Sequence, residues 1–236
     1  MRWFHATWVF AVLVLAFAVG PAAADILVLQ GTAAMDDAWV WSGGGGGTYN
    51  DLQLQRGSWI KHVFIKFDLS GLPAGQTINS AKFHVDFCND PPDHTGIVID
   101  VHYLTRDWDE ATVSWTNASN VGGNPVPWTT PGGDYEVEPA MQLNDIGDPA
   151  IWDEMILADF GPMVQAWLNG RKPNYGLIYK YRVESPDPNN INFNIAASEW
   201  AAHVQPYLTI DYIPEPATVA LLGLGGVGLV ALRRRR

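Results

Sequence analysis

IKHVFIKFDLSGLPAGQTINSAKFHVDF, residues 60–87, consists of two alternating apolar runs joined by a polar loop. In an extended chain, a period of two gives one face of the first run to Lys61, Val63, Ile65, Phe67 and Leu69. Gly71, Pro73 and Gly75 turn the chain, and the second run repeats the period at Ala81, Phe83, Val85 and Phe87. Two strands cannot bury their apolar faces alone, so the stretch predicts the centre of a β-sandwich, with the face from Lys61 to Leu69 toward the core.

The composition fits one acidic domain. The chain has 236 residues, of which 47% are hydrophobic and 17% charged, enough for one sizeable core. Of its 14 basic and 25 acidic residues, five arginines and one glutamate lie in the two terminal segments, which leaves 9 basic and 24 acidic residues and a net charge of −15 between them. This charge repels phosphates and anionic headgroups, which excludes nucleic acid as a partner, and it suits divalent cations or neutral partners.

Residues 1–24 have the composition of a secretory signal helix. Arg2 supplies the positive start, residues 8–19 form the apolar run, and three alanines at 22–24 form a small-residue cleavage site. We therefore expect the protein to be exported.

The other end combines three short features in order. Pro214, Glu215 and Pro216 precede an apolar span at residues 217–232, which is followed by Arg233, Arg234, Arg235 and Arg236. As a helix the span would extend about 24 Å, slightly less than the roughly 30 Å hydrocarbon core, and terminal arginines can snorkel to the interface. The pattern predicts a C-terminal transmembrane helix with its basic end in the cytoplasm.

Between the ends, the pattern predicts further strands and one short amphipathic helix. Period-two runs predict strands at residues 25–30, 37–41, 96–105, 175–183, 191–196 and 207–213. Phe160, Met163, Val164, Trp167 and Leu168 repeat at helical spacing, with Asp159 as the cap and Gly170 at the end. The helix must pack this stripe against the sandwich.

Two stretches read as loops. Residues 116–149 are rich in Gly and Pro and predict loops draped over the sandwich, with a short strand at 135–138. The five glycines at 43–47 predict a mobile surface loop, since the run lacks the Lys and Ser or Thr of a phosphate-binding loop.

The ordered C-terminal trio resembles the PEP-CTERM sorting signal. The resemblance implies a bacterial protein that is exported, anchored transiently in the inner membrane by its tail, and cut near the PEP motif by an exosortase. Its destination would be the cell surface, the outer membrane or an extracellular polysaccharide matrix. On this basis the chain divides into a signal peptide at 1–24, one domain at 25–213 and a sorting signal at 214–236.

The order of motifs within the domain is similar to that of the DNRLRE domain. The matching motifs are DAWV at 37–40, FIKFDLS at 64–70, LPAG at 72–75, INSA at 78–81, Trp108 with Glu110, Thr112, Val113 and Trp115, then Trp167, NYGL at 174–177, Ser198 with Glu199, and PYLTIDY at 206–212. The resemblance implies an all-β jelly-roll sandwich related to carbohydrate-binding modules and often attached to polysaccharide-degrading enzymes. The chain departs from the family at the glycine run and before Ser198, where an arginine is common.

Aromatic residues in turns are the candidates for sugar binding. Sugar rings stack their C–H faces on aromatic planes, and their hydroxyls need a few polar partners. The candidates are Trp59 with Arg56, Trp128, Tyr49 and Trp200. The competing interpretation is that each ring folds back over the sandwich. Trp108, Trp115 and Trp167 are interpreted as core residues.

A structural calcium ion is the candidate cofactor. The single cysteine, Cys88, cannot form an intramolecular disulfide, so stability must come from packing, with a metal as a further source. Asp36 and Asp37 near the start of the domain and Glu199 near its end are the candidate ligands, because the ends of a sandwich commonly lie close together. The alternative is that all three are ordinary solvated acids.

The sequence does not predict an enzyme. Asp107, Asp109 and Glu110 form an acidic cluster, but nothing pairs two of them across a cleft as a glycosidase requires. The leading hypothesis is a non-catalytic exported protein with a carbohydrate-binding-like module. The alternatives are a structural matrix protein without specific sugar binding and, less favoured, a polysaccharide-degrading enzyme.

Overall fold

The computed structural model describes residues 24–88, 97–144, 154–184 and 191–214. Ala24–Pro214 forms one compact unit. The predicted signal helix and C-terminal membrane helix lie outside the described residues. Within those residues, no helix has the length and apolar character needed to cross a membrane.

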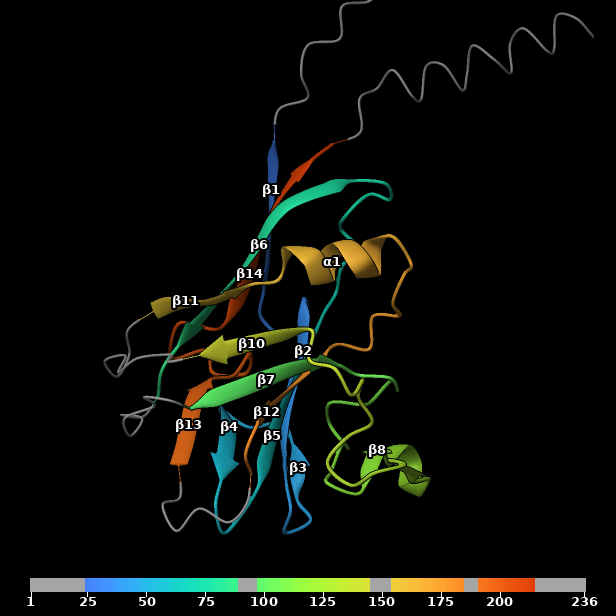
Figure 1. Ribbon diagram of the computed structural model, residues 1–236, viewed down its shortest axis with the longest axis vertical. Coiled ribbons are helices and arrows are strands. Elements are labelled where there is room, and N and C mark those ends of the chain that lie inside the picture. The colour runs from blue at the N-terminus through green and yellow to red at the C-terminus, as the bar shows by residue number, and fades with distance from the viewer. Residues whose placement is uncertain (1–23, 89–96, 145–153, 185–190, 215–236) are drawn as a thin grey trace, which may run out of the picture. The chain divides into compact units, whose positions relative to one another are not determined.

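Two antiparallel sheets form the body of this unit (Figure 1). The smaller sheet has the order β1 (Asp25–Gln30), β14 (Tyr207–Ile213), β6 (Thr77–Asp86) and β11 (Glu154–Asp159). The larger sheet has the order β10 (Met141–Asn144), β7 (Val98–Tyr103), β12 (Leu177–Tyr181), β5 (Lys61–Phe67), β2 (Met35–Trp41) and β3 (Gly46–Gly47), with β4 (Asp51–Arg56) joining β5 to β13 (Ile191–Ala196). The predicted all-β sandwich is confirmed, and the finer jelly-roll topology stays a prediction.

The two strands of the 60–87 stretch belong to different sheets and face each other across the core. The Phe67 ring of β5 lies 5.5 Å from the Phe83 ring of β6, and Phe160 stacks on Phe83 at 5.6 Å. Val63 and Ile65 are buried in the same cluster, as predicted for this face of β5. Alternating side chains from both sheets therefore fill the space between the layers.

The opposite face of β5 is also buried, which the sequence pattern did not predict. His62 and Phe64 are buried there, and the Phe64 ring lies 5.5 Å from Trp108 and 5.6 Å from Trp128. The cover is the chain between β7 and β10, residues 104–140, which includes most of the predicted loops and which we call the draped segment. Its regular elements are the short β8 (Asn117–Ser119), a 3₁₀ turn (Val121–Gly123) and β9 (Val126–Pro127). This second core makes β5 a strand that is enclosed on both sides.

The helix α1 (Gly161–Leu168) is confirmed and packs beside β6. Its buried residues include Met163, Val164 and Trp167 from the predicted stripe. Phe160, rather than Asp159, takes the cap position, but the Asp159 carboxylate still accepts hydrogen bonds from the backbone N–H groups of Gly161 at 2.9 Å and Ala81 at 2.8 Å. One carboxylate thus joins the start of the helix to the smaller sheet.

Two local predictions were wrong. The strand expected at 135–138 is reduced to one bridge between Tyr135 and Leu104, while the regular strand forms later, in β10. The glycine run is not wholly a loop, because its last two residues pair with Trp39 and Val40 as β3. Glycine adopts this close pairing because it has no side chain to clash with the backbone of Val113.

We expect Phe64→Ala to lower the free energy of unfolding by about 3–5 kcal/mol, because it empties the centre of the second core. Urea unfolding followed by tryptophan fluorescence measures this loss. The matched control is Val28→Ala on the exposed face of β1, which should change stability by less than about 0.5 kcal/mol. Equal effects of the two substitutions would contradict a packed second core.

Candidate functional site

Four aromatic rings gather at the end of β2, and we call Trp39, Trp41, Tyr49 and Trp59 the aromatic platform. The Tyr49 ring lies 4.8 Å from Trp39 at an angle of 32°, and the Trp59 ring lies 4.9 Å from Trp41 at 66°. Trp39 and Trp41 share one face of β2, so the two ring pairs lie side by side along the strand.

The platform combines a buried base with an exposed surface. Trp39 is buried, whereas Tyr49 is 45% exposed and Trp59 is 48% exposed. Among the described residues, no other aromatic side chain reaches this exposure class. The platform therefore exposes two rings to solvent, and packing on the neighbouring tryptophans fixes their positions.

Polar groups border the platform. The Lys61 ammonium lies 4.8 Å from the centre of the Trp39 ring and donates a hydrogen bond of 2.5 Å to Oε1 of Gln53. Gln53 in turn donates to the Asp51 carboxylate at 2.9 Å. Burial lowers the pKa of Lys61, and the charge of Asp51 acts in the opposite direction. An ammonium, an amide and a carboxylate are thus held beside the rings.

The glycine run shapes this end of the molecule. A Cβ added at Gly43 would lie 2.2 Å from the Trp41 ring, and one added at Gly45 would lie 2.1 Å from its indole nitrogen. Both distances are far shorter than van der Waals contact. The run therefore lies directly against Trp41, which explains glycine at these two positions without a ligand.

The structure separates the five residues proposed for sugar binding. Tyr49 and Trp59 are in the platform. Trp128 is 5% exposed, and its indole donates to the Ser114 carbonyl at 3.0 Å, so its assignment to a binding surface was wrong. The Trp128 ring covers β5, and the burial of this apolar ring decides its position although the turn around it is polar.

The other two candidates lie against partners of their own. Trp200 is half-buried with its ring 4.4 Å from His203. The Arg56 guanidinium lies 5.7 Å from the centre of the Tyr181 ring. The residues that sequence reasoning missed are Trp39, Trp41 and Lys61, although the shared face of the two tryptophans was visible in the alternation.

A second candidate site is a cluster of three carboxylates from three segments. Asp37 of β2, Glu110 of the draped segment and Glu199 after β13 each place one oxygen within 4.8 Å of the others. β3 pairs only with Trp39 and Val40, so the edge of β2 at Asp37 is open, and the Asp37 N–H donates to Glu110 Oε1 at 2.7 Å. The Ser198 N–H donates to Asp37 Oδ2 at 2.8 Å.

Burial and mutual repulsion perturb this carboxylate cluster. Burial raises the pKa of Asp37 well above its usual range, and the charge of Glu199 raises it further. Burial also raises the pKa of Glu110 to about 7, with a contribution from Glu199. Negative charge at this position is therefore costly unless a positive partner is supplied.

The carboxylate cluster only partly matches the set expected from sequence. Asp37 and Glu199 come together as proposed, but the Asp36 carboxylate pairs with the Lys66 ammonium at 2.7 Å instead. Adjacent residues of a strand point to opposite faces, so Asp36 and Asp37 cannot both enter one site. Glu110 takes the place expected for Asp36, and its position in the motif between Trp108 and Val113 was the available signal.

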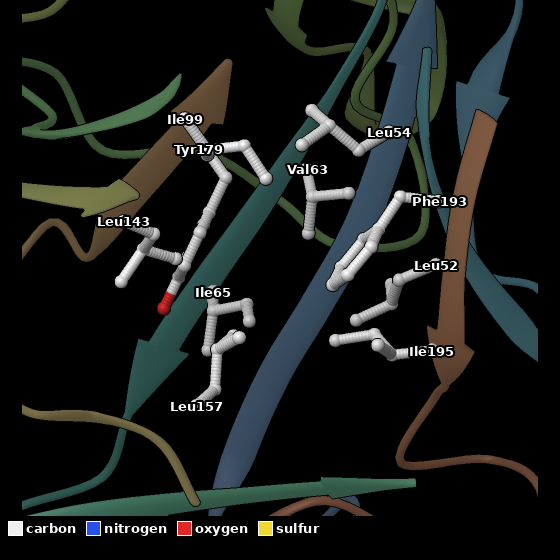
Figure 2. A pocket seen from close by; sticks show the side chains of 10 residues that line it. All are labelled: Leu52, Leu54, Val63, Ile65, Ile99, Leu143, Leu157, Tyr179, Phe193 and Ile195. Atoms are coloured by element: carbon white, nitrogen blue, oxygen red, sulfur yellow. The ribbon is translucent and has the colours of Figure 1, made fainter. Parts of the chain in front are cut away.

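Two hollows of the described residues differ in their lining. The cavity between the sheets is apolar and measures about 10 Å³, too small for a sugar ring; Figure 2 shows its lining, with the Tyr179 hydroxyl among aliphatic side chains. An open hollow of about 570 Å³ lies beside Asp36, Lys66 and Asp107, where the ammonium occupies the space between the two acids. Asp68 also lines the open hollow.

Comparison with known families agrees with the two resemblances. Residues 29–131 match carbohydrate-binding module family 96, and residues 213–236 match the PEP-CTERM protein-sorting motif. A comparison with curated proteins gives no match. The first match contains the aromatic platform as well as Asp37 and Glu110. Together the two matches support an exported, carbohydrate-binding protein that an exosortase sorts.

We expect Gly45→Ala to displace the Trp41 ring and to destabilise the protein by about 1–3 kcal/mol, because the added methyl group overlaps the indole. Near-UV circular dichroism and thermal unfolding measure both effects. Gly71→Ala is the control, since its Cβ would meet Leu27 at an ordinary 3.7 Å. An unchanged aromatic signal in Gly45→Ala would show that the glycine run does not confine the ring.

Proposed function

We propose that this chain is an exported, non-catalytic surface or matrix protein whose domain, residues 25–213, binds polysaccharide through the aromatic platform. In this proposal the signal peptide at 1–24 directs export. The segment 214–236 anchors the chain transiently in the inner membrane until an exosortase cuts near the PEP motif. The mature protein then resides at the cell surface, the outer membrane or the extracellular matrix, and its sandwich has the jelly-roll topology.

One observation carries the binding proposal: the only two well-exposed aromatic rings of the described residues lie at the same end of β2. The C–H faces of a sugar ring can stack on Tyr49 and Trp59, because each ring rests on a tryptophan that fixes its position. Lys61, Gln53 and Asp51 provide donors and acceptors for sugar hydroxyls. Preorganised rings lose little entropy on binding, which favours affinity.

A second candidate function is a structural matrix protein without specific sugar binding. The 66° angle between Trp41 and Trp59 favours it, because an edge-on contact also serves simply to cover the end of the core. The acidic character of the domain would keep such a protein hydrated and soluble. The two functions differ in whether truncation of the exposed rings affects any interaction with sugar.

We expect Trp59→Ala and Tyr49→Ala each to weaken polysaccharide binding at least about tenfold, or about 1.4 kcal/mol, because each removes a stacking surface. Affinity electrophoresis of the full chain through gels containing laminarin, xylan, mannan, xanthan or alginate measures the binding. Trp200→Ala is the matched control, because the same side chain is removed outside the platform. If no polysaccharide retards the wild type, or if all variants are retarded equally, the structural function is favoured instead.

We expect replacement of Pro214, Glu215 and Pro216 by alanine to leave the chain uncleaved in the membrane fraction, because the exosortase no longer recognises the tail. Immunoblots of fractionated cells of a host with an exosortase measure the size and location of the chain. The control is the wild-type chain in a host without the exosortase, which should show the same retention. Normal release of the alanine variant would contradict the proposed sorting.

A further inference from the structure

We propose that Asp37, Glu110 and Glu199 bind one hard divalent cation, with Ca²⁺ as the best match. The site is separate from sugar recognition and goes beyond the proposed function. It also differs from the set expected from sequence, because Glu110 takes the place of Asp36.

The spacing of the three carboxylates allows one ion to reach them all. Calcium binds oxygen ligands at 2.3–2.6 Å, so two oxygens on opposite sides of one ion lie about 5 Å apart. The contributed oxygens of Asp37, Glu110 and Glu199 all lie within 4.8 Å of one another. An ion placed among them would contact each acid without a large movement of the backbone.

A second observation points to a ligand. Asp37 is 1% exposed, and its Oδ1 accepts no hydrogen bond from an N–H or O–H donor of the described residues; the side-chain contact of its carboxyl group is with a second acid, Glu199. Oε2 of Glu199 and the hydroxyl of Ser198 are likewise buried without a partner. A buried carboxylate oxygen without a donor is costly, and two such oxygens, on Asp37 and Glu199, belong to the same cluster, which favours a positive group at this position.

Within the described residues, the charge of Lys66 lowers the pKa of Glu110, but this ammonium forms its salt bridges with other acids. None of the three acids forms a salt bridge within residues 24–88, 97–144, 154–184 and 191–214. Lys66 is engaged by Asp36 at 2.7 Å and by Asp107 at 3.3 Å. Three carboxyl groups therefore face one another without a salt-bridge partner, and a divalent cation would allow all three to be ionised together.

The donor set selects the kind of cation. Among the described residues it consists of carboxylate oxygens and includes no sulfur or imidazole, which favours calcium over zinc. Backbone N–H groups hold Asp37 Oδ2 and Glu110 Oε1, so the orientation of both carboxylates is set before an ion binds. The irregular geometry of three different segments suits calcium better than magnesium, which demands near-ideal octahedral sites.

The bound ion would act as a non-covalent crosslink. Asp37 belongs to β2, Glu110 to the draped segment that covers the second core, and Glu199 to the turn before β14. Because the chain has only one cysteine, a cation is the available means of joining these segments beyond packing. Loss of the ion should loosen the cover of the second core first.

The test measures thermal unfolding of the full chain in EDTA and in about 5 mM CaCl₂, the range that suits extracellular sites. We expect calcium to raise the Tm of the wild type by about 5 °C or more. Terbium luminescence sensitised by the aromatic residues reports direct occupancy. No Tm shift together with no terbium signal would overturn the proposal.

Isosteric variants identify the ligands. Glu110→Gln keeps the oxygen that accepts the hydrogen bond from the Asp37 N–H, so the variant should fold. In EDTA its Tm should equal or exceed that of the wild type, and calcium should raise its Tm by less than about 1 °C. Glu199→Gln should behave in the same way. Asp36→Asn is the matched control and should keep the full shift, because Asp36 pairs with Lys66. The assignment would be overturned if Asp36→Asn lost the calcium-induced rise in Tm while Glu110→Gln kept it. An equal rise in Tm with MgCl₂ in every variant would also overturn it.

Discussion

The enclosure of β5 on both faces is the constraint on which the rest of the structure depends. Val63 and Ile65 point into the space between the sheets, while Phe64 points the other way, under Trp108 and Trp128. A strand with two buried faces needs a cover on each side, and only one cover can be the second sheet. The long irregular segment after β7 supplies the other cover, which explains how a stretch with little regular structure is held in place.

The same cover positions both candidate sites beside β2. The draped segment brings Glu110 to the open edge of β2 at Asp37, and its residues around Val113 lie against the glycine run that confines Trp41. Alternation places Asp37 on the same face of β2 as Trp39 and Trp41, two and four residues further along. One strand therefore carries an acidic group and an aromatic group for the two proposed ligands, and each candidate site is completed by a segment distant in sequence.

The two proposals make different use of rigidity. A sugar platform gains from rings that are already fixed when the ligand arrives, and packing on buried tryptophans provides this. A cation site holds its carboxyl groups close together before the ion binds, so the site adds stability only in an environment that supplies the ion. Both suit an exported protein, which meets polysaccharide and millimolar calcium outside the cytoplasm.

The sequence by itself determined the fold class, most strands, the helix and both resemblances, because these depend on local periodicity and on short ordered motifs. It could not show that Trp128 is buried or that Glu110 joins Asp37, because both facts follow from where the draped segment crosses the larger sheet. Strand alternation alone could have separated Asp36 from Asp37. The motif between Trp108 and Val113 singled out Glu110, but only the tertiary structure decided that it joins Asp37, since a contact between residues 73 positions apart leaves no local pattern in the chain.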